Sequence, residues 1–129
     1  MKPSLLITAG AFVVAGILHF VIPKLYVSIM PSWHPSWLPS PLMLVYISGV
    51  CEVLGAAGLL VPGTRTLAAA GLMLLLVAVF PANIEMLRLA QARGASPAFI
   101  AACWFRLPLQ PLLIWWVWRV SQSANDLSR

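Results

Sequence analysis

The sequence has very little charge. Only 9% of its 129 residues are Asp, Glu, Lys or Arg, and three of those are acidic, whereas 61% are hydrophobic. A water-soluble chain of this length cannot bury so many apolar side chains, because small domains leave a large share of their surface exposed. The shortage of charge argues against a soluble domain and predicts an all-α integral membrane protein in contact with the lipid bilayer.

The sequence also lacks the motifs of the common catalytic and cofactor sites. It has no glycine-rich phosphate loop, nucleophile elbow or dinucleotide fingerprint. It has no metal-ligand spacing, so we expect no bound metal. The eight Lys and Arg form no basic run, so we expect no nucleic-acid partner despite the net charge of +5. Without a catalytic constellation, the question of enzyme activity is left open.

Cysteine is scarce as well. The two cysteines, Cys51 and Cys103, stand apart and form no CxxC motif. Isolated cysteines in apolar helices are usually small apolar side chains that fill space. A redox-active or disulfide-bonded pair is the less favoured interpretation.

Four long apolar runs are present instead. A run of about 20 apolar residues is long enough to cross a bilayer as a helix. The first run ends at Pro23 without a small-x-small cleavage site, so we expect an uncleaved span rather than a secretory signal. The chain is therefore predicted to be a single membrane domain, residues 1–129, with spans at residues 4–22, 42–61, 66–86 and 98–118.

Prolines are concentrated in two parts of the sequence, the first loop and the last span. The segment from Lys24 to Pro41 is rich in proline and tryptophan, which predicts an interfacial first loop, preceded by a short turn or helix at Lys24 to Met30. An interfacial anchor is favoured over a lid for this loop. In the last span, Pro108 and Pro111 each remove a backbone donor, which predicts a four-helix transmembrane bundle with a proline-broken fourth helix.

Polar residues within the spans are the candidate functional residues. Glu52 lies about 15 Å into its span at about 1.5 Å per residue. A charge at that depth costs at least ~2.5 kcal/mol, so it needs a partner, a proton or a water-lined cavity. Antiparallel spans put both termini on one side and gather these residues in the half nearest the first and third loops. The predicted polar cluster is His19, Glu52, Asn83, Arg106 and Gln110.

We predict that Glu52 pairs with Arg106, since opposite charges at similar depth relieve each other's desolvation. Gln110 follows Arg106 by one helical turn and shares its face. Glu85 and Arg88, three residues apart, are expected to pair along their helix. The cluster is either a structural polar knot or a pocket for a small, partly apolar ligand, and the proline-rich fourth span favours the pocket.

The basic residues favour one orientation weakly. Four lie on the side of the termini (Lys2, Arg65, Arg119 and Arg129), against three on the other side (Lys24, Arg88 and Arg93). The positive-inside rule then predicts cytoplasmic termini in the cell (inner) membrane.

Four short motifs, one from each span, are familiar. Gly16-x-x-His19-Phe20-x-x-Pro23, Tyr46-x-Ser48-Gly49-x-x-Glu52-x-x-Gly55, Phe80-Pro81-Ala82-Asn83 and Arg106-Leu107-Pro108-Leu109-Gln110 together resemble the DoxX-like family of small bacterial membrane proteins. The resemblance implies a four-helix membrane bundle. Some members of that family are subunits of thiosulfate:quinone oxidoreductases or of other membrane oxidoreductase complexes, and distant eukaryotic relatives are assembly chaperones.

Three functions follow as hypotheses. The favoured one is a non-catalytic or accessory subunit that binds a quinone-like or lipid ligand in the polar intramembrane site for a membrane redox complex. The alternative is a membrane-protein assembly factor with a purely structural polar cluster, whose partner is another membrane protein. A small-solute transporter is weaker, since no inverted repeat is evident and four spans would require a homo-oligomer.

Overall fold

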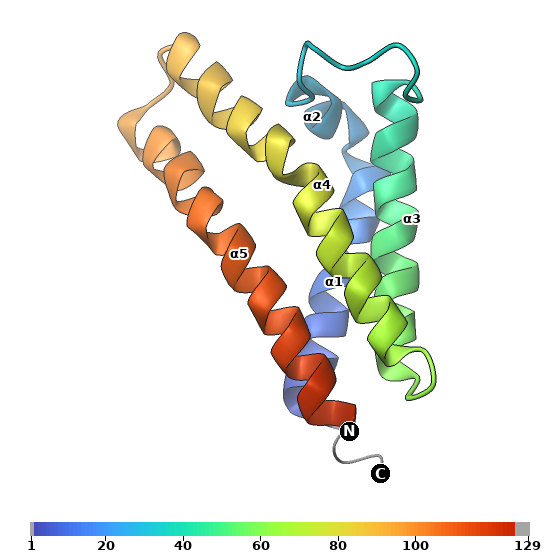
Figure 1. The fold of residues 1–129 in the computed structure, drawn as a ribbon. Helices are drawn as coiled ribbons and strands as arrows, with labels where there is room; N and C mark the ends of the chain where they lie inside the picture. Colours follow the sequence, from blue (N-terminus) through green and yellow to red (C-terminus); the bar gives the residue numbers. More distant parts are fainter. Residues whose placement is uncertain (1, 126–129) are drawn as a thin grey trace.

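The computed structural model describes residues 2–125, which form five helices (Figure 1). They are α1 (Pro3–Val21), α2 (Pro23–Ser28), α3 (Pro41–Leu60), α4 (Arg65–Ala92) and α5 (Pro97–Asn125). Four of them, α1, α3, α4 and α5, are long and apolar enough to cross a membrane. The four predicted helices are confirmed, although α4 and α5 extend beyond the predicted spans. Met1 and the tail from residue 126, with the Arg129 used in the orientation count, lie outside the described residues.

Prolines and small capping residues set the helix boundaries. Helices α1, α2, α3 and α5 all begin with proline, whose fixed φ suits the first helical position and whose missing N–H costs nothing there. The Ser40 hydroxyl accepts a hydrogen bond of 3.3 Å from the Met43 N–H and caps α3. Gly94, with φ of +63°, follows the end of α4 in the left-handed conformation typical of helix ends. The boundaries are therefore largely encoded locally.

The long helices run up and down, with both ends of the described chain at the same end of the bundle (Figure 1). Helix α1 packs against α3, α4 packs against α3 and α5, and α2 lies against α1 and α3. The main core joins all four long helices, with Leu5, Leu59, Leu72 and Val117 fully buried. These residues lie towards the end of the bundle that holds the two ends of the chain. At the end of the bundle where the α2–α3 and α4–α5 connections lie, α4 and α5 diverge from α1 and α3 (Figure 1).

The prediction of a broken last helix is wrong. Helix α5 continues through Pro108 and Pro111, and α4 continues through Pro81 (Figure 1). Each proline removes only one backbone donor, and a neighbouring helix can bond to the carbonyls that a proline disturbs. In the turn before Pro81, the Gln110 side chain donates to the Leu76 carbonyl, next to the Val77 carbonyl that Pro81 leaves without its helical donor.

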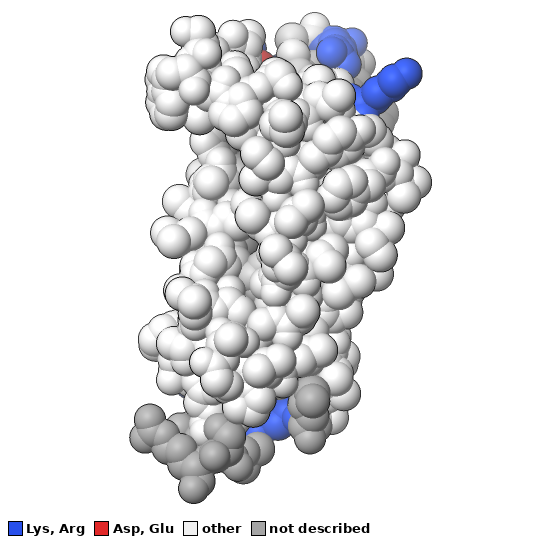
Figure 2. Space-filling model, turned by 90° about the vertical axis from the view of Figure 1, so that its right-hand side faces the viewer, with Lys and Arg blue, Asp and Glu red and all other residues white. Residues whose placement is uncertain are grey.

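The outer surface is apolar between its two ends. Figure 2 shows a broad uncharged belt with Lys and Arg confined to the ends of that face. Large hydrophobic side chains point outward on every long helix, among them Ile7, Leu54, Leu74 and Phe105. A continuous apolar surface of this kind is normally covered by a partner or by lipid.

Candidate functional site

The site begins with a close crossing of α1 and α3. A Cβ atom built on Gly49 would lie 2.8 Å from the Gly16 carbonyl oxygen, and one on Gly16 would lie 2.8 Å from the Gly49 carbonyl oxygen. Two backbones can approach this closely only where both residues lack a side chain. Because His19 and Glu52 each follow one of these glycines by three residues, the crossing brings their side chains together.

His19 and Glu52 form a nearly enclosed pair. The His19 Nδ1 atom lies 3.3 Å from Glu52 Oε2, and the two side chains are 10% and 12% exposed. The same Nδ1 atom lies 2.9 Å from the Ala15 carbonyl oxygen. Because a carbonyl only accepts, Nδ1 must carry a hydrogen and donate it to Ala15. Oε2 is then buried without a hydrogen bond from any residue in the described chain.

A buried carboxyl oxygen without a hydrogen bond requires a hydrogen-bond donor or a proton. An unpaired buried carboxylate is strongly disfavoured, so either the pair holds an extra proton or a donor from outside the chain completes it. A proton on Glu52 gives a neutral acid beside a neutral imidazole, and a proton on His19 Nε2 gives an ion pair. Either arrangement has a net charge of zero.

Tyr26 of α2 connects this pair to the rest of the site. Its ring stacks on His19, with ring centroids 4.0 Å apart and planes inclined by 20°. Burial is the main reason that the pKa of the Tyr26 phenol is raised above its usual value near 10, the negative charge of Glu52 raises it further, and the positive charge of Arg106 opposes the shift. Tyr26 therefore lies within electrostatic range of both Glu52 and Arg106.

A second polar group joins α4 to α5. The buried Gln110 side chain donates a hydrogen bond of 2.5 Å to the Leu76 carbonyl and accepts one from the Asn83 amide. The Asn83 carbonyl oxygen in turn accepts a hydrogen bond of 3.3 Å from Arg106 Nη2. Arg106 itself is exposed and makes this one hydrogen bond. The expectation that Gln110 and Arg106 share a face of their helix fits this arrangement.

The predicted ion pair between Glu52 and Arg106 is wrong. Glu52 faces α1 through the glycine crossing and pairs with His19, whereas Arg106 lies on α5, which packs mainly against α4 and is held by Asn83. The depth of a residue along its helix does not fix the direction in which its side chain leaves that helix.

The predicted pair of Glu85 and Arg88 is confirmed. Arg88 donates hydrogen bonds of 2.9 Å and 2.5 Å to the two carboxylate oxygens of Glu85. These were the expected partners three residues apart on one helix.

Tyr26 was missed by the sequence reasoning. It follows His19 by seven residues, which would place it two turns further on one face of a continuous helix. The helix ends at Val21 and restarts at Pro23, so this periodicity could not be used across the break.

The cysteines lie on different helices and both are free thiols. Cys51 is exposed on α3, and Cys103 is buried between α4 and α5 beside Leu87 and Ala90. The disulfide interpretation is therefore wrong, and redox reactivity of either thiol stays a prediction. Within residues 2–125, His, Cys, Asp and Glu form no group of three that could hold a metal ion.

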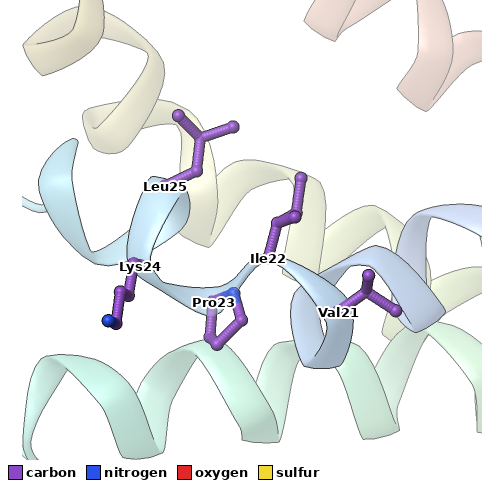
Figure 3. A pocket seen from close by; sticks show the side chains of 5 residues that line it. All are labelled: Val21, Ile22, Pro23, Lys24 and Leu25. Carbon is purple, nitrogen blue, oxygen red and sulfur yellow. The ribbon is translucent and has the colours of Figure 1, made fainter.

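An open hollow lies at the junction of α1 and α2. It is lined by Val21, Ile22, Pro23, Lys24 and Leu25 (Figure 3). Ile22 and Leu25 point away from α3, whereas Pro23 and Lys24 point towards it (Figure 3). The hollow is thus mainly apolar, with one cationic side chain at its edge.

Comparison with known proteins gives a family. A family model described as a domain of unknown function, DUF8561, matches residues 8–121. No curated protein and no solved structure matches the chain. The matched segment includes His19, Glu52, Asn83, Arg106 and Gln110. Because the family model covers most of the sequence, the chain belongs to the DUF8561 family.

Proposed function

We propose that the chain is an integral membrane protein that crosses the bilayer with α1, α3, α4 and α5. The length and apolar composition of these four helices support the proposal, as does the uncharged belt between basic ends (Figure 2). The basic residues favour the cell (inner) membrane with cytoplasmic termini. In that orientation the His19–Glu52 pair lies in the outer half of the bilayer.

We further propose that the protein binds the headgroup of an amphiphile between the His19–Glu52 pair and Arg106. The ligand is a quinone-like molecule or a lipid. The Glu52 Oε2 atom carries this proposal, because it lies near His19 but accepts no hydrogen bond, and a buried carboxyl oxygen normally has a donor. A ligand hydroxyl could supply that donor, and the Arg106 guanidinium could donate to a second ligand oxygen.

A purely structural polar cluster would satisfy its own atoms. The Asn83–Gln110 pair does this, since both side chains bond to each other and to neighbouring groups. Glu52 and Arg106 do not, because one has a buried oxygen without a donor and the other uses one of its five donors. Both groups lie within electrostatic range of Tyr26.

The wider role is that of a non-catalytic or accessory subunit for a membrane redox complex. This part of the proposal rests on the resemblance of the four motifs to the DoxX-like family. The chain supplies a binding site in this role, and a partner subunit would supply the redox centre.

The direct test is mass spectrometry of protein extracted gently from its native membrane. The comparison is between the wild type, Glu52→Gln and Glu85→Gln as the matched control, since Glu85 is also buried but has its own partner in Arg88. We expect a specific quinone or lipid to stay with the wild type and with Glu85→Gln and to leave Glu52→Gln. A wild type without a specific small molecule, or equal loss in both variants, would refute the ligand site.

The alternative, a membrane-protein assembly factor, is favoured by two glycines with open surroundings. A Cβ atom added to Gly10 on α1 or to Gly71 on α4 would have no neighbouring atom within 4 Å, so a partner helix could approach closely at either one. Cross-linking in native membranes tests it. Repeated capture of one other membrane protein would support this role, and capture of self-contacts alone would contradict it.

A further inference from the structure

Arg106 keeps unused hydrogen-bond donors among the apolar residues of α5. It lies about 14 Å along α5 from Pro97, at about 1.5 Å per residue, and about 20 Å before Arg119. Its side chain is exposed, and the single hydrogen bond to Asn83 leaves four N–H donors unused. A cation at this depth of a membrane helix is costly without a counter-charge.

Within the described residues, no carboxylate forms an ion pair with Arg106. Glu52 is paired with His19, and both oxygens of Glu85 are bonded to Arg88. Neither carboxylate is therefore bonded to the Arg106 guanidinium. Lys24, at the edge of the α1–α2 hollow, is a further cation (Figure 3).

The surroundings of Arg106 also fit an apolar tail. Leu109 and Leu113 follow Arg106 by three and seven residues, so they lie on its side of α5, and both are exposed. Ile22, just before α2, and Leu25 on α2 are exposed and point away from α3 (Figure 3). An acyl chain beside Arg106 could run along these leucines towards the middle of the bilayer.

We propose that Arg106, oriented by Asn83, binds the anionic phosphate or carboxylate headgroup of an amphiphile that enters the site sideways from the bilayer. The inference rests on the function proposed above and names the charge of its ligand. A guanidinium presents two parallel N–H donors, which match two oxygens of a phosphate or a carboxylate. Asn83 holds that fork in place because Gln110 fixes the Asn83 amide from the other side.

The test uses the full chain in lipid nanodiscs of defined composition. One arm contains equal amounts of dioleoyl phosphatidylglycerol and dioleoyl phosphatidylcholine, and a second adds oleate or oleyl alcohol to phosphatidylcholine alone. Native mass spectrometry then counts the lipids that stay bound. Retention of phosphatidylglycerol identifies a phosphate headgroup, and retention of oleate over oleyl alcohol identifies a carboxylate.

Two arginines of α5 provide a matched comparison. Arg106→Gln should lower retention of the anionic amphiphile at least about tenfold, as expected for lost hydrogen bonds to a charged group. Arg119→Gln should change it less than about twofold, because Arg119 lies over the Trp115 ring at the other end of the helix. Asn83→Asp is a second, nearly isosteric variant that places a carboxylate beside Arg106 and should also prevent anion binding.

Equal retention of anionic and neutral amphiphiles in both arms would overturn the inference, and so would equal losses in Arg106→Gln and Arg119→Gln. The result is separable from that for Glu52. If Glu52→Gln releases a native ligand while Arg106→Gln does not change anion retention, the proposed function stands and this inference fails. If retention depends on Arg106 but no native ligand depends on Glu52, the anion site stands and the role of Glu52 fails.

Discussion

Gly49→Ala tests whether the close crossing of α1 and α3 positions the His19–Glu52 pair. The new Cβ atom would lie 2.8 Å from the Gly16 carbonyl oxygen, whereas ordinary contacts begin at 3.4 Å. The Phe20 ring, 2.7 Å away, could turn aside, but the backbone carbonyl cannot. The two helices must therefore separate by roughly 0.6 Å at the crossing, since close-packed interiors have no room to absorb the atom.

The energetic result is a competition between two effects. Overpacking costs about 1–3 kcal/mol, and alanine in place of glycine in a helix returns about 0.5–1 kcal/mol. We expect a net loss of about 1–2 kcal/mol of unfolding free energy. Gly10→Ala is the control, because nothing lies within 4 Å of its Cβ position and only the gain in helix propensity applies.

The assay is reversible unfolding in mixed detergent micelles, followed by helical circular dichroism, with ligand retention measured on the same samples. Separation of the helices would also lengthen the 3.3 Å distance between His19 and Glu52, so Gly49→Ala should release the ligand that Glu52→Gln releases. Equal stability of Gly49→Ala and Gly10→Ala would refute the packing argument. A destabilised Gly49→Ala that keeps its ligand would show that the crossing does not position the site.

Two further predictions concern single side chains. Gln110→Leu removes both hydrogen bonds of the buried Gln110 side chain and should cost about 1–3 kcal/mol of unfolding free energy. Gln91→Leu, on the exposed end of α4, should change the unfolding free energy by no more than about 0.5 kcal/mol. Equal effects of the two substitutions would contradict the structural role of Gln110. The phenol of Tyr26, isolated by the absorbance difference from Tyr26→Phe, should titrate above its usual value near 10, and its pKa should fall in Glu52→Gln and rise in Arg106→Gln. Because the folded state holds this proton more tightly than the unfolded state, stability should decline as the pH rises from about 10 through the raised pKa. A Tyr26 pKa that both substitutions leave unchanged would contradict its electrostatic interaction with the two charges.

The sequence by itself determined the helices. Apolar runs long enough to cross a bilayer correspond to α1, α3, α4 and α5, because the length and composition of a helix are local properties. Pro41 with the Ser40 cap marks the start of α3 for the same reason. The Glu85–Arg88 pair was also predictable, since residues three apart on one helix must be neighbours.

Predictions from the local sequence were less reliable where contacts with neighbouring helices affect the backbone. Pro108 and Pro111 predicted a broken helix, yet α5 is continuous. The cost of a missing backbone donor depends on what else can bond to the freed carbonyls, and the sequence around a proline does not contain that information.

Only the tertiary structure decided which polar side chains meet. The depth of Glu52 and Arg106 follows from counting residues, but rotation about each helix axis is set by packing, and the contact of Gly16 with Gly49 turns Glu52 towards His19. The position of Tyr26 depends on the helix break at Ile22, across which no periodicity holds. The sequence therefore gives the depth of each polar group, whereas contacts between helices far apart in the chain give its partner.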